Sequence, residues 1–545
     1  MPQMTGGEAL AKSLYREGVR VIFGLPGIQL YGLMAALRDE PGIRFIVTRH
    51  EQGAAYMADG YARAGGEFGT SLVVPGPGLY NASAALSTAY SASSPVLMVS
   101  GQIPKDSIGK DVGQLHEVND QLEAIKPVTK WQRRVLEVSD IPAAVHEAVY
   151  QLKTGRPRPV EIEFPLDTLE GLGEAELLEA SNPVRPVAAA ADIDRAAEML
   201  LAAKRPVIIA GGGVVGGDAG EGLAAVAEHL QAGVITSMSG KGAMDDRSYL
   251  SLGCPGFPSG PLLEHIQAAD IVLAVGTRFV WSGVRDDQQV IQLDIDPEEI
   301  GRNHDKTFGL EGDGGRTLAA LLERLQSDGN ARASRRDELE ELRAGIAAGA
   351  QETQPQGGMV AALREACPED TILISGLTQV AYYSVPHWPV YGPRTYLTSG
   401  YQGTLGFAYP TGLGAKVACP DAPVVVLSGD GGFLYSVQEM ATAVQHGINA
   451  VVVVFNDGAY GNVSRDLDDD WGGTYGAELH NPDFTALAES FGLTGIKVDD
   501  HAALGTSVAD AIQMDRPVLV EVPVDRMPRP TFFPRRPPPG ETIPL

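Results

Sequence analysis

The stretch that decides the fold spans residues 422–463 and contains APVVVLSGDGGF (422–433) followed by SVQEMATAVQHGINAVVVVFNDGAYGNV (436–463). It holds two short apolar runs rich in β-branched residues, Val424–Leu427 and Val451–Phe455. Each run ends in a polar turn, and a helical pattern lies between the two runs. This is the pattern of a βαβ unit, whose two parallel strands deliver both turns to the same edge of a sheet.

The two turns carry the chemistry that a magnesium–diphosphate complex requires. The first turn is Gly429-Asp430-Gly431-Gly432 and the second is Asn456-Asp457-Gly458-Ala459, with the two acids 27 positions apart. Mg²⁺ that holds a diphosphate takes one or two carboxylates, and phosphate, carbonyl and water oxygens complete its octahedron. Glycines let the backbone approach the phosphates closely. These residues predict a metal-assisted diphosphate site; the alternative is a βαβ unit with ordinary glycine turns.

Length and composition narrow the class of protein. The 545 residues exceed a single hydrophobic core and suggest three domains of about 150–180 residues. The net charge of −27 argues against nucleic acid or an anionic membrane surface as a partner. Cys254, Cys367 and Cys419 fit neither a metal-binding spacing nor a disulfide framework. No apolar run approaches about 18 residues and the N-terminus has no apolar signal core, so we expect a soluble cytoplasmic protein that acts on a small molecule.

Helix and strand patterns alternate along three blocks of the chain. We expect a first domain over residues 1–170, a second over 186–340 and a third over 356–525, with a Pro-rich basic tail over 526–545. The Pro- and Ala-rich segment SNPVRPVAAAAD (181–192) reads as the first linker. Units such as PVIIAGGG (206–213) and DIVLAVGT (270–277) are typical of a doubly wound sheet. The sequence therefore predicts an α/β protein of three doubly wound domains with mostly parallel sheets.

With these features, nearly the whole chain resembles the pyruvate oxidase-like branch of thiamine diphosphate-dependent enzymes, and in particular the acetolactate synthase large subunit. The resemblance implies a pyrimidine-binding domain, a central domain and a diphosphate-binding domain, in that order. It implies thiamine diphosphate and Mg²⁺ as cofactors. It also implies a homodimer or homotetramer, because the active site of the family lies between the first domain of one subunit and the third domain of another.

The resemblance assigns a set of metal ligands. The family signature, GDG…N, supplies the acid of GDG, the second Asn of an Asn-Asn pair, and a backbone carbonyl two residues later. Carried over to this chain, these ligands are Asp430, Asp457 and the carbonyl of Ala459. The chain departs from the pattern because Asn456 is followed by an acid. A side-chain oxygen is retained, so we expect Mg²⁺ to bind at a site with one more negative charge.

The resemblance also assigns residues to the organic cofactor. A bulky apolar residue, here Leu405, forces the bent shape of the cofactor, and the nearby carbonyl of Gly403 meets its amino group. Thr378 and Gln379 fall where family members contact the diphosphate, although a plain strand-end turn is the competing interpretation. The remaining expected cofactor contacts are Gly429, Gly431, Gly432, Tyr460 and Gly461.

Glu51 is the main catalytic candidate. It lies in VTRHEQGAAYMADGYAR (47–63), at the end of a predicted strand and the start of a helix. In the family, the Glu at this place protonates the aminopyrimidine of the cofactor, whose resulting tautomer removes the thiazolium proton. That task needs a carboxylate with a raised pKa in a water-poor cleft. The alternative is an ordinary acid that interacts with the helix dipole.

Gln114 and His116 are candidates for the substrate side of the site. They lie in KDVGQLHEVND (110–120), where acetolactate synthases read Phe-Gln-Glu. This chain keeps Gln114 but has Gly113 in place of the Phe. His116 is a candidate proton donor, and the alternative is a structural loop histidine. Further on, SRDLDDDWGG (464–473) brings acids, Asp466 and Asp469, where acetolactate synthases use a Trp and an Arg, which disfavours anionic pyruvate as second substrate.

The central block contains a weak nucleotide-binding pattern. Residues 211–216 read GGGVVG and fit G-x-G-x-x-G after a strand, but the acid expected after the next strand is absent. Asp294 and Asp296, after a later strand, could contact a ribose. The family uses this domain for FAD, for ADP or for neither. Its flavin-contacting Arg-Phe-Asp-Asp-Arg is replaced here by RFVWS (278–282), so FAD or ADP is possible but tightly bound FAD is not favoured.

The leading hypothesis is a lyase or carboligase that decarboxylates a 2-oxo acid and joins the product to a second carbonyl. The alternative is thioester cleavage by a 2-hydroxyacyl-CoA lyase or oxalyl-CoA decarboxylase-like enzyme, whose basic tail (Arg526, Arg529, Arg535 and Arg536) would close on CoA. A flavin-dependent 2-oxo acid oxidase and a non-catalytic paralogue are less favoured.

Overall fold

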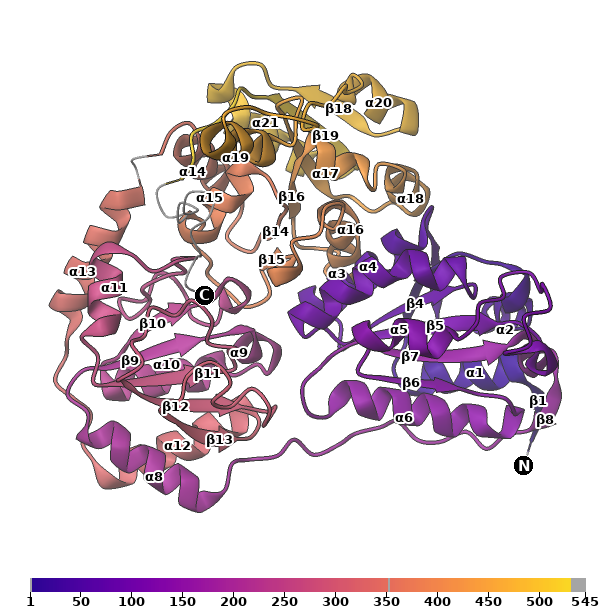
Figure 1. The fold of residues 1–545 in the computed structure, drawn as a ribbon, viewed down its shortest axis with the longest axis horizontal. Coiled ribbons are helices and arrows are strands. Elements are labelled where there is room, and N and C mark those ends of the chain that lie inside the picture. The colour runs from indigo at the N-terminus through magenta and orange to yellow at the C-terminus, as the bar shows by residue number, and fades with distance from the viewer. Residues whose placement is uncertain (1, 351–352, 531–545) are drawn as a thin grey trace.

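The computed structural model describes residues 2–350 and 353–530. The chain forms three α/β lobes, each built on a parallel sheet (Figure 1). The first and third lobes pack against each other, and a long extended connection runs along the lower edge of the molecule from the first lobe to α8 of the second. The predicted fold class, three doubly wound domains with mostly parallel sheets, is confirmed.

The first lobe has a six-stranded parallel sheet. In spatial order its strands are β3 (Arg44–Val47), β2 (Val21–Gly24), β4 (Gly69–Val73), β5 (Val96–Gln102), β7 (Val160–Pro165) and β6 (Trp131–Arg134). Its helices are α1 (Gly6–Arg16), α2 (Tyr31–Asp39), α3 (Glu51–Ala64), α4 (Pro77–Ala92), α5 (Gln121–Ile125), α6 (Ile141–Lys153) and α7 (Leu166–Glu170). A short antiparallel pair, β1 (Gln3–Thr5) with β8 (Leu172–Glu174), joins the two ends of the lobe.

The third lobe repeats this topology. In spatial order its strands are β15 (Tyr396–Thr398), β14 (Ile372–Ser375), β16 (Val424–Gly429), β17 (Val451–Asn456), β19 (Val518–Pro523) and β18 (Thr494–Lys497). Its helices are α14 (Gln356–Ala366), α15 (Gln379–His387), α16 (Ala408–Ala418), α17 (Asp430–Leu434), α18 (Glu439–His446), α19 (Gly461–Trp471), α20 (Phe484–Phe491) and α21 (Leu504–Gln513). Numbered along the chain, both six-stranded sheets have the order second, first, third, fourth, sixth, fifth.

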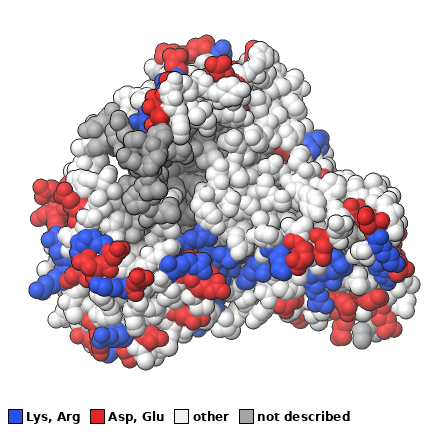
Figure 2. Space-filling model, viewed as in Figure 1, with Lys and Arg blue, Asp and Glu red and all other residues white. Residues whose placement is uncertain are grey.

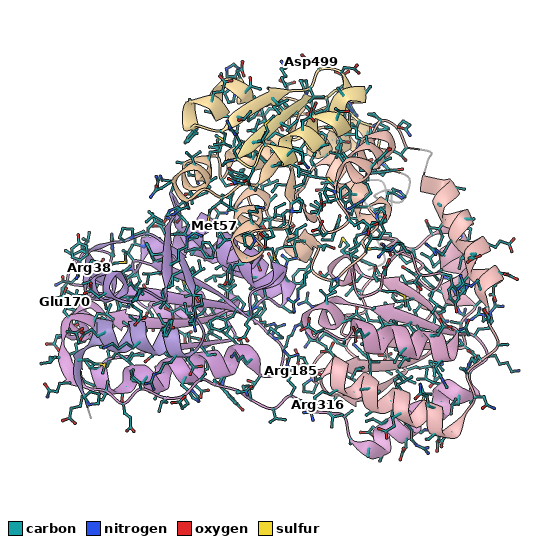
Figure 3. The ribbon with its side chains drawn as sticks, turned by 180° about the vertical axis from the view of Figure 1, so that it is seen from behind. Arg38, Met57, Glu170, Arg185, Arg316 and Asp499 are labelled. Carbon is teal, nitrogen blue, oxygen red and sulfur yellow. The ribbon has the colours of Figure 1, made fainter. Side chains whose placement is uncertain are left out.

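The central lobe has a five-stranded parallel sheet of flavodoxin-like order. Its strands are β10 (Gly233–Thr236), β9 (Pro206–Ala210), β11 (Ile271–Val275), β12 (Gln289–Asp294) and β13 (Thr307–Glu311). Its helices are α8 (Ala190–Ala202), α9 (Gly212–Gly216), α10 (Gly220–Leu230), α11 (Gly260–Gln267), α12 (Gly314–Asp328) and α13 (Arg336–Ala350). The linker residue Arg185 is anchored here, because its guanidinium pairs with Asp313 at 3.3 Å and its carbonyl accepts from Arg316 (Figure 3).

One apolar core is shared by the first and third lobes, whereas the central lobe has a core of its own. The contact between the two lobes is made by α3 and α16, and Met57 of α3 lies at this junction (Figure 3). A Cβ on Gly60 would collide with the carbonyl of Thr411, and a Cβ on Gly414 would collide with the carbonyl of Met57. Glycine at both places lets the two helix backbones touch, which fixes the first lobe against the third.

The sequence pattern does not predict three of the edge strands. β6 reads WQRR, β13 reads TFGLE and β18 reads TGIK, and each is an outer strand of its sheet. An outer strand is covered less completely than an inner one, so it lacks the continuous apolar run by which the buried strands are recognised. No helix among the described residues has the length and apolar character needed to cross a lipid bilayer.

Candidate cofactor and active site

The two acidic turns meet at the carboxyl end of the six-stranded sheet of the third lobe, as their spacing predicts. β16 and β17 are paired neighbours, with Gly429 opposite Phe455. Asp430 follows β16 and is 2% exposed. Its carboxylate accepts from the Gly431 amide at 2.8 Å, the Gly458 amide at 3.0 Å and Asn481 Nδ2 at 2.6 Å. The second turn is therefore bonded directly to the acid of the first.

Asp457 stands beside Asp430 in this crevice. Burial, together with the charge of Asp430, raises the pKa of Asp457 to about 6, and burial also raises the pKa of Asp430. Asp457 Oδ1 accepts from the amide of Ala459 at 3.3 Å. Two carboxylates held this close repel each other, so the arrangement favours a cation between them.

The donor set suits Mg²⁺ with a diphosphate. Among the described residues, no group of three or more His, Cys, Asp and Glu side chains could hold a metal on its own. Two carboxylates and a backbone carbonyl leave about half of an octahedron to oxygens from phosphate and water. Asn481, which the sequence pattern did not single out, adds a buried Oδ1 with no hydrogen-bond partner next to Asp430. An unsatisfied buried acceptor here fits a site that takes a cation or a donor group.

The expected cofactor contacts gather around the same turns. Thr378, just before α15, lies with its Cβ 3.5 Å from where a Cβ of Gly429 would be. Leu405 packs on Gly432, because its Cδ2 lies 3.7 Å from where a Cβ of Gly432 would be. The ring of Tyr460 covers Gly431, because a Cβ there would lie 2.6 Å from it. Gly403 is in the left-handed region, with a φ of +58°, which a residue with a Cβ rarely adopts.

Gln379 and Gly461 belong to a second layer of contacts behind Asp457. A Cβ on Gly461 would collide with Asp457 Oδ2 and would lie 3.2 Å from Gln379 Nε2. Gln379 is 5% exposed, and its Oε1 accepts from Arg465 NH1 at 2.7 Å. Arg465, on α19, is 4% exposed. The sequence pattern did not point to Arg465, since a single basic residue within an acidic helix reads as a surface residue.

Glu51 begins α3 in the first lobe, at the carboxyl end of β3. It is partly exposed on this chain, and its Oε2 accepts from Asn81 Nδ2 at 3.1 Å. The Gly78 turn lies beside Oε1. Two residues earlier, the amide of Arg49 donates to both carboxylate oxygens of Glu439, each at 3.2 Å. Glu439 is fully buried and belongs to α18 of the third lobe, so it ties the start of the catalytic-candidate helix to the other lobe.

His116 and Gln114 both lie on the loop that follows β5, but their side chains have different surroundings. His116 has a φ of +68° and its Nδ1 lies 3.2 Å from Gln29 Oε1. Gln29 Nε2 donates to the carbonyl of Leu115 at 3.0 Å, so its oxygen is the end that faces the histidine. Gln114 has an exposed side chain, and its amide donates to Glu117 Oε2 at 2.8 Å.

A buried polar network supports the backbone of residues 76–78 beside Glu51. Gln121 Oε1 accepts from the amide of Gly76 at 2.8 Å, and its Nε2 donates to Glu163 Oε2 at 2.7 Å. Glu161 lies on the same face of β7, and burial raises the pKa of both of these acids. The carbonyl of His116 packs on Gly76, where a Cβ would collide with it. This network therefore supports both the Gly76–Gly78 turn and the His116 loop.

Glu51 and His116 belong to the first lobe, whereas Asp430 and Asp457 belong to the third lobe. Among the described residues, no hydrogen bond or ion pair connects Glu51 or His116 with Asp430 or Asp457. The viewed face over the junction of the first and third lobes carries few charged side chains, while mixed charges crowd the lower part of the molecule (Figure 2). Leu115, next to His116 in the chain, and Tyr80, next to Asn81, have exposed apolar side chains.

In the central lobe, the glycine-rich turn has a packing role. A Cβ on Gly211 would collide with the carbonyl of Gly276, and a Cβ on Gly213 would lie 2.7 Å from the Cα of Gly276. These glycines therefore let the turn after β9 pass close to the turn after β11. Burial raises the pKa of Asp294 to about 6, and Asp296 pairs with Arg156 of the first lobe at 3.5 Å.

The basic residues at the start of the tail are engaged in ion pairs. Arg526 pairs with Asp468 at 2.6 Å and with Asp469 at 2.9 Å. Arg529 pairs with Asp466 at 2.7 Å and with Asp470 at 3.4 Å. Four acids of α19 thus hold the segment that follows β19. Arg535 and Arg536 lie outside the described residues.

The three lobes match three family descriptions in the same order. These are "Thiamine pyrophosphate enzyme, N-terminal TPP binding domain" over residues 4–124, "Thiamine pyrophosphate enzyme, central domain" over 193–321, and "Thiamine pyrophosphate enzyme, C-terminal TPP binding domain" over 376–522. Thiamine pyrophosphate is another name for thiamine diphosphate.

Individual relatives match over most of their length. A probable 2-ketoarginine decarboxylase of Pseudomonas aeruginosa is 37% identical, over 90% of this chain and 88% of that protein. A probable acetolactate synthase large subunit of Methanocaldococcus jannaschii is 33% identical, over 96% of this chain and 92% of that protein. The acetolactate synthase isozyme 3 large subunit of Escherichia coli is 31% identical, over 96% of both chains. With its three TPP-enzyme domains and these full-length relatives, the chain belongs to the thiamine diphosphate-dependent enzymes.

Proposed function

We propose that this chain uses thiamine diphosphate and Mg²⁺ to decarboxylate a 2-oxo acid and to join the remaining fragment to a second carbonyl compound, as an acetolactate synthase-like carboligase. The observation that carries the proposal is the meeting of Asp430 and Asp457 at glycine turns on the carboxyl edge of the third sheet. The relatives support the substrate class, since one is named a 2-ketoarginine decarboxylase and others acetolactate synthases.

In this proposal the third lobe holds the cofactor. Asp430, Asp457 and the carbonyl of Ala459 hold Mg²⁺, and the backbone at Gly429, Gly431 and Gly432 receives the diphosphate. Thr378, Gln379, Gly403, Leu405, Tyr460 and Gly461 complete the surroundings of the cofactor. The bound cofactor supplies a carbon nucleophile for the substrate carbonyl and accepts the negative charge that decarboxylation leaves.

The first lobe supplies the acid–base groups. Glu51 exchanges a proton with the cofactor, and Asn81 and the Gly78 turn keep its carboxylate in place. His116, oriented by Gln29 through Nδ1, gives or takes a proton at the substrate through Nε2. Gln114 remains a candidate substrate contact from its exposed position. In this proposal each complete site takes its first-lobe half from one chain and its third-lobe half from another, in a homodimer or homotetramer, as the family resemblance implies.

The alternatives receive less support from the described contacts. Arg526 and Arg529 are neutralised by acids of α19, which leaves them poorly placed to bind the phosphates of CoA. The glycine turn of the central lobe is accounted for by packing on Gly276, so we propose that catalysis requires no bound FAD. ADP in the central lobe remains compatible with this proposal.

The experiment is an assay of CO₂ release from a panel of 2-oxo acids, with pyruvate, 2-oxobutanoate and 2-ketoarginine among them, run with and without thiamine diphosphate and Mg²⁺. Products are identified by mass spectrometry, with acyl-CoA cleavage measured in parallel. We expect CO₂ from at least one 2-oxo acid, only when both cofactors are present, and a ligated product when a second carbonyl compound is supplied.

Asp430→Ala is the control variant. Removing a buried carboxylate that binds the metal leaves the diphosphate charge poorly neutralised, so calorimetry should show loss of both cofactors and the assay loss of CO₂ release. Unchanged cofactor affinity in this variant would overturn the metal assignment. Acyl-CoA cleavage without decarboxylation of any 2-oxo acid would favour the thioester alternative.

A further inference from the structure

In the proposed metal site, the carboxylate of Asp457 lies near that of Asp430 and requires a hydrogen-bond donor to hold it in place. Asp430 and Asp457 are neighbouring acids in one crevice, and neither forms an ion pair with any described residue. Asp430 is held by two backbone amides and Asn481. One oxygen of Asp457 accepts a long hydrogen bond, 3.3 Å, from the Ala459 amide. Its other oxygen faces Gly461 and the end of the Gln379 side chain.

Gln379 is oriented so that its donor end meets this oxygen. Its Oε1 accepts from Arg465 NH1 at 2.7 Å, so the opposite end of the amide, Nε2, is turned toward Asp457. A hydrogen bond from Gln379 to the carboxylate of Asp457 follows from this orientation. Nε2 and Asp457 Oδ2 both lie over Gly461, where the absence of a side chain leaves room for the contact.

Arg465 is itself locked in place. The side chain is 5% exposed and donates to Asn462 Oδ1 through NH2. Its Nε and NH2 also donate to Asp466 Oδ1, at 3.2 and 3.0 Å. Arg529 holds the same Asp466 from the other side at 2.7 Å. A buried cation whose three nitrogens each donate to a neighbouring acceptor holds Gln379 in one orientation.

We propose that Arg465 and Gln379 form a positioning relay that holds Asp457 as a metal ligand and offsets its extra negative charge. The inference rests on the proposed cofactor site and extends it to two residues that do not touch the metal. The relay is specific for an acid. A carboxylate only accepts hydrogen bonds, so it matches a fixed donor from Gln379, whereas an Asn at 457 could present its own amide hydrogens to that donor.

The test is a double-mutant cycle on Mg²⁺ affinity. Calorimetry measures Mg²⁺ binding at saturating thiamine diphosphate for the wild type, Arg465→Met, Asp457→Asn and the double variant. Outer partners of metal ligands are worth about 10–100-fold in metal affinity, so Arg465→Met should weaken Mg²⁺ binding by about that factor. In the Asp457→Asn background the same change should cost less than about 3-fold, because the acid it serves is gone.

Arg529→Met is the matched control, since Arg529 touches Asp466 but not Gln379. It should change Mg²⁺ affinity by less than about 3-fold. Thermal unfolding checks that each variant folds, and Gln379→Leu, which removes the middle of the relay, replaces Arg465→Met if that variant does not fold. Gln379→Leu should show the same loss.

Two results overturn the relay: unchanged Mg²⁺ affinity in both relay variants, or equal losses with Asp and with Asn at 457. Both presuppose that the wild type binds Mg²⁺ with thiamine diphosphate. A wild type that binds neither would instead refute the proposed function, so the two failures are distinguishable.

Discussion

At the scale of single residues, the sequence pattern located the acids and the structure added their partners. Asp430 and Asp457 were predictable because each follows a buried strand, and neighbouring parallel strands end at one edge. Asn481, Arg465 and Glu439 were not predictable. They reach the site from helices and loops whose approach depends on tertiary packing, and nothing in their local sequence distinguishes them from surface residues.

Glu51→Gln tests the proposed acid–base role. Gln preserves the size of the side chain but cannot exchange a proton with the cofactor. Turnover should therefore drop by about 10²–10⁴-fold while thiamine diphosphate binding stays nearly intact. The direct measurement is the rate at which the C2 hydrogen of the bound cofactor exchanges with deuterium, followed by acid quench and NMR.

A helix-start acid with no catalytic role would behave differently. It would contribute only about 0.3–1 kcal/mol of stability through the helix dipole. Asp192→Asn, which removes an acid from the first turn of α8 in the central lobe, is the control for that effect. C2 exchange in Glu51→Gln as fast as in the wild type would make Glu51 structural.

Glu439 predicts a pH dependence of stability. Burial raises the pKa of Glu439 to about 7, well above the unfolded value of about 4.3. Because the folded-state pKa is the higher one, the stability that the protonated group provides is present at low pH and is lost as the pH rises through 7. Glu439→Gln removes this loss. Between pH 5 and pH 8 the free energy of unfolding of the variant should therefore rise, relative to that of the wild type, by about 3 kcal/mol at most.

Denaturant unfolding of both proteins at a series of pH values measures this difference. The wild-type curve should fall with rising pH relative to that of the variant, mainly between about pH 5 and pH 7.5. Parallel curves across this range would show that the Glu439 carboxyl group does not titrate with a raised pKa.

At the scale of elements, the sequence predicted the buried strands and the helices that follow them. The run VVVL and the run VVVVF became β16 and β17 because residues covered on both faces must be apolar. The outer strands β6, β13 and β18 were missed for the opposite reason. The predicted domain boundaries at 170, 186, 340, 356 and 525 remain predictions. The helices and linkers around them have no apolar pattern that marks the residue at which a domain begins or ends.

Gly60→Ala tests the crossing of α3 and α16. The new Cβ would collide with the carbonyl of Thr411, and a backbone atom inside a helix cannot move aside easily. Overpacking of this kind costs about 1–3 kcal/mol, so the variant should be less stable by that amount in urea unfolding. A variant as stable as the wild type would show that the two helices are not in direct backbone contact.

Gly345→Ala provides the matched control. Gly345 lies in α13, where a Cβ would meet its nearest neighbour, Pro261, at 3.9 Å. Alanine in an unhindered helix interior is favoured over glycine, so this variant should be more stable by about 0.5–1 kcal/mol.

At the scale of the whole molecule, the distribution of the candidate residues over two lobes is the decisive feature. The first lobe carries Glu51 and His116, the third carries Asp430 and Asp457, and the lobes are fixed to each other by a shared core. As the family resemblance implies, we expect an active assembly of at least two chains, and sedimentation at assay concentrations should show no active monomer.

The measurement that tests the account most directly is activity in mixed assemblies of Glu51→Gln and Asp430→Ala. The two variants carry different affinity tags and are produced together, and the mixed species is purified through both tags. If each site takes Glu51 from one chain and Asp430 from the other, a mixed pair contains one doubly damaged site and one intact site. We expect both parent variants to be nearly inactive and the mixed species to recover about half of the wild-type CO₂ release per pair. A mixed species as inactive as its parents would contradict the account, because each site would then be built within a single chain.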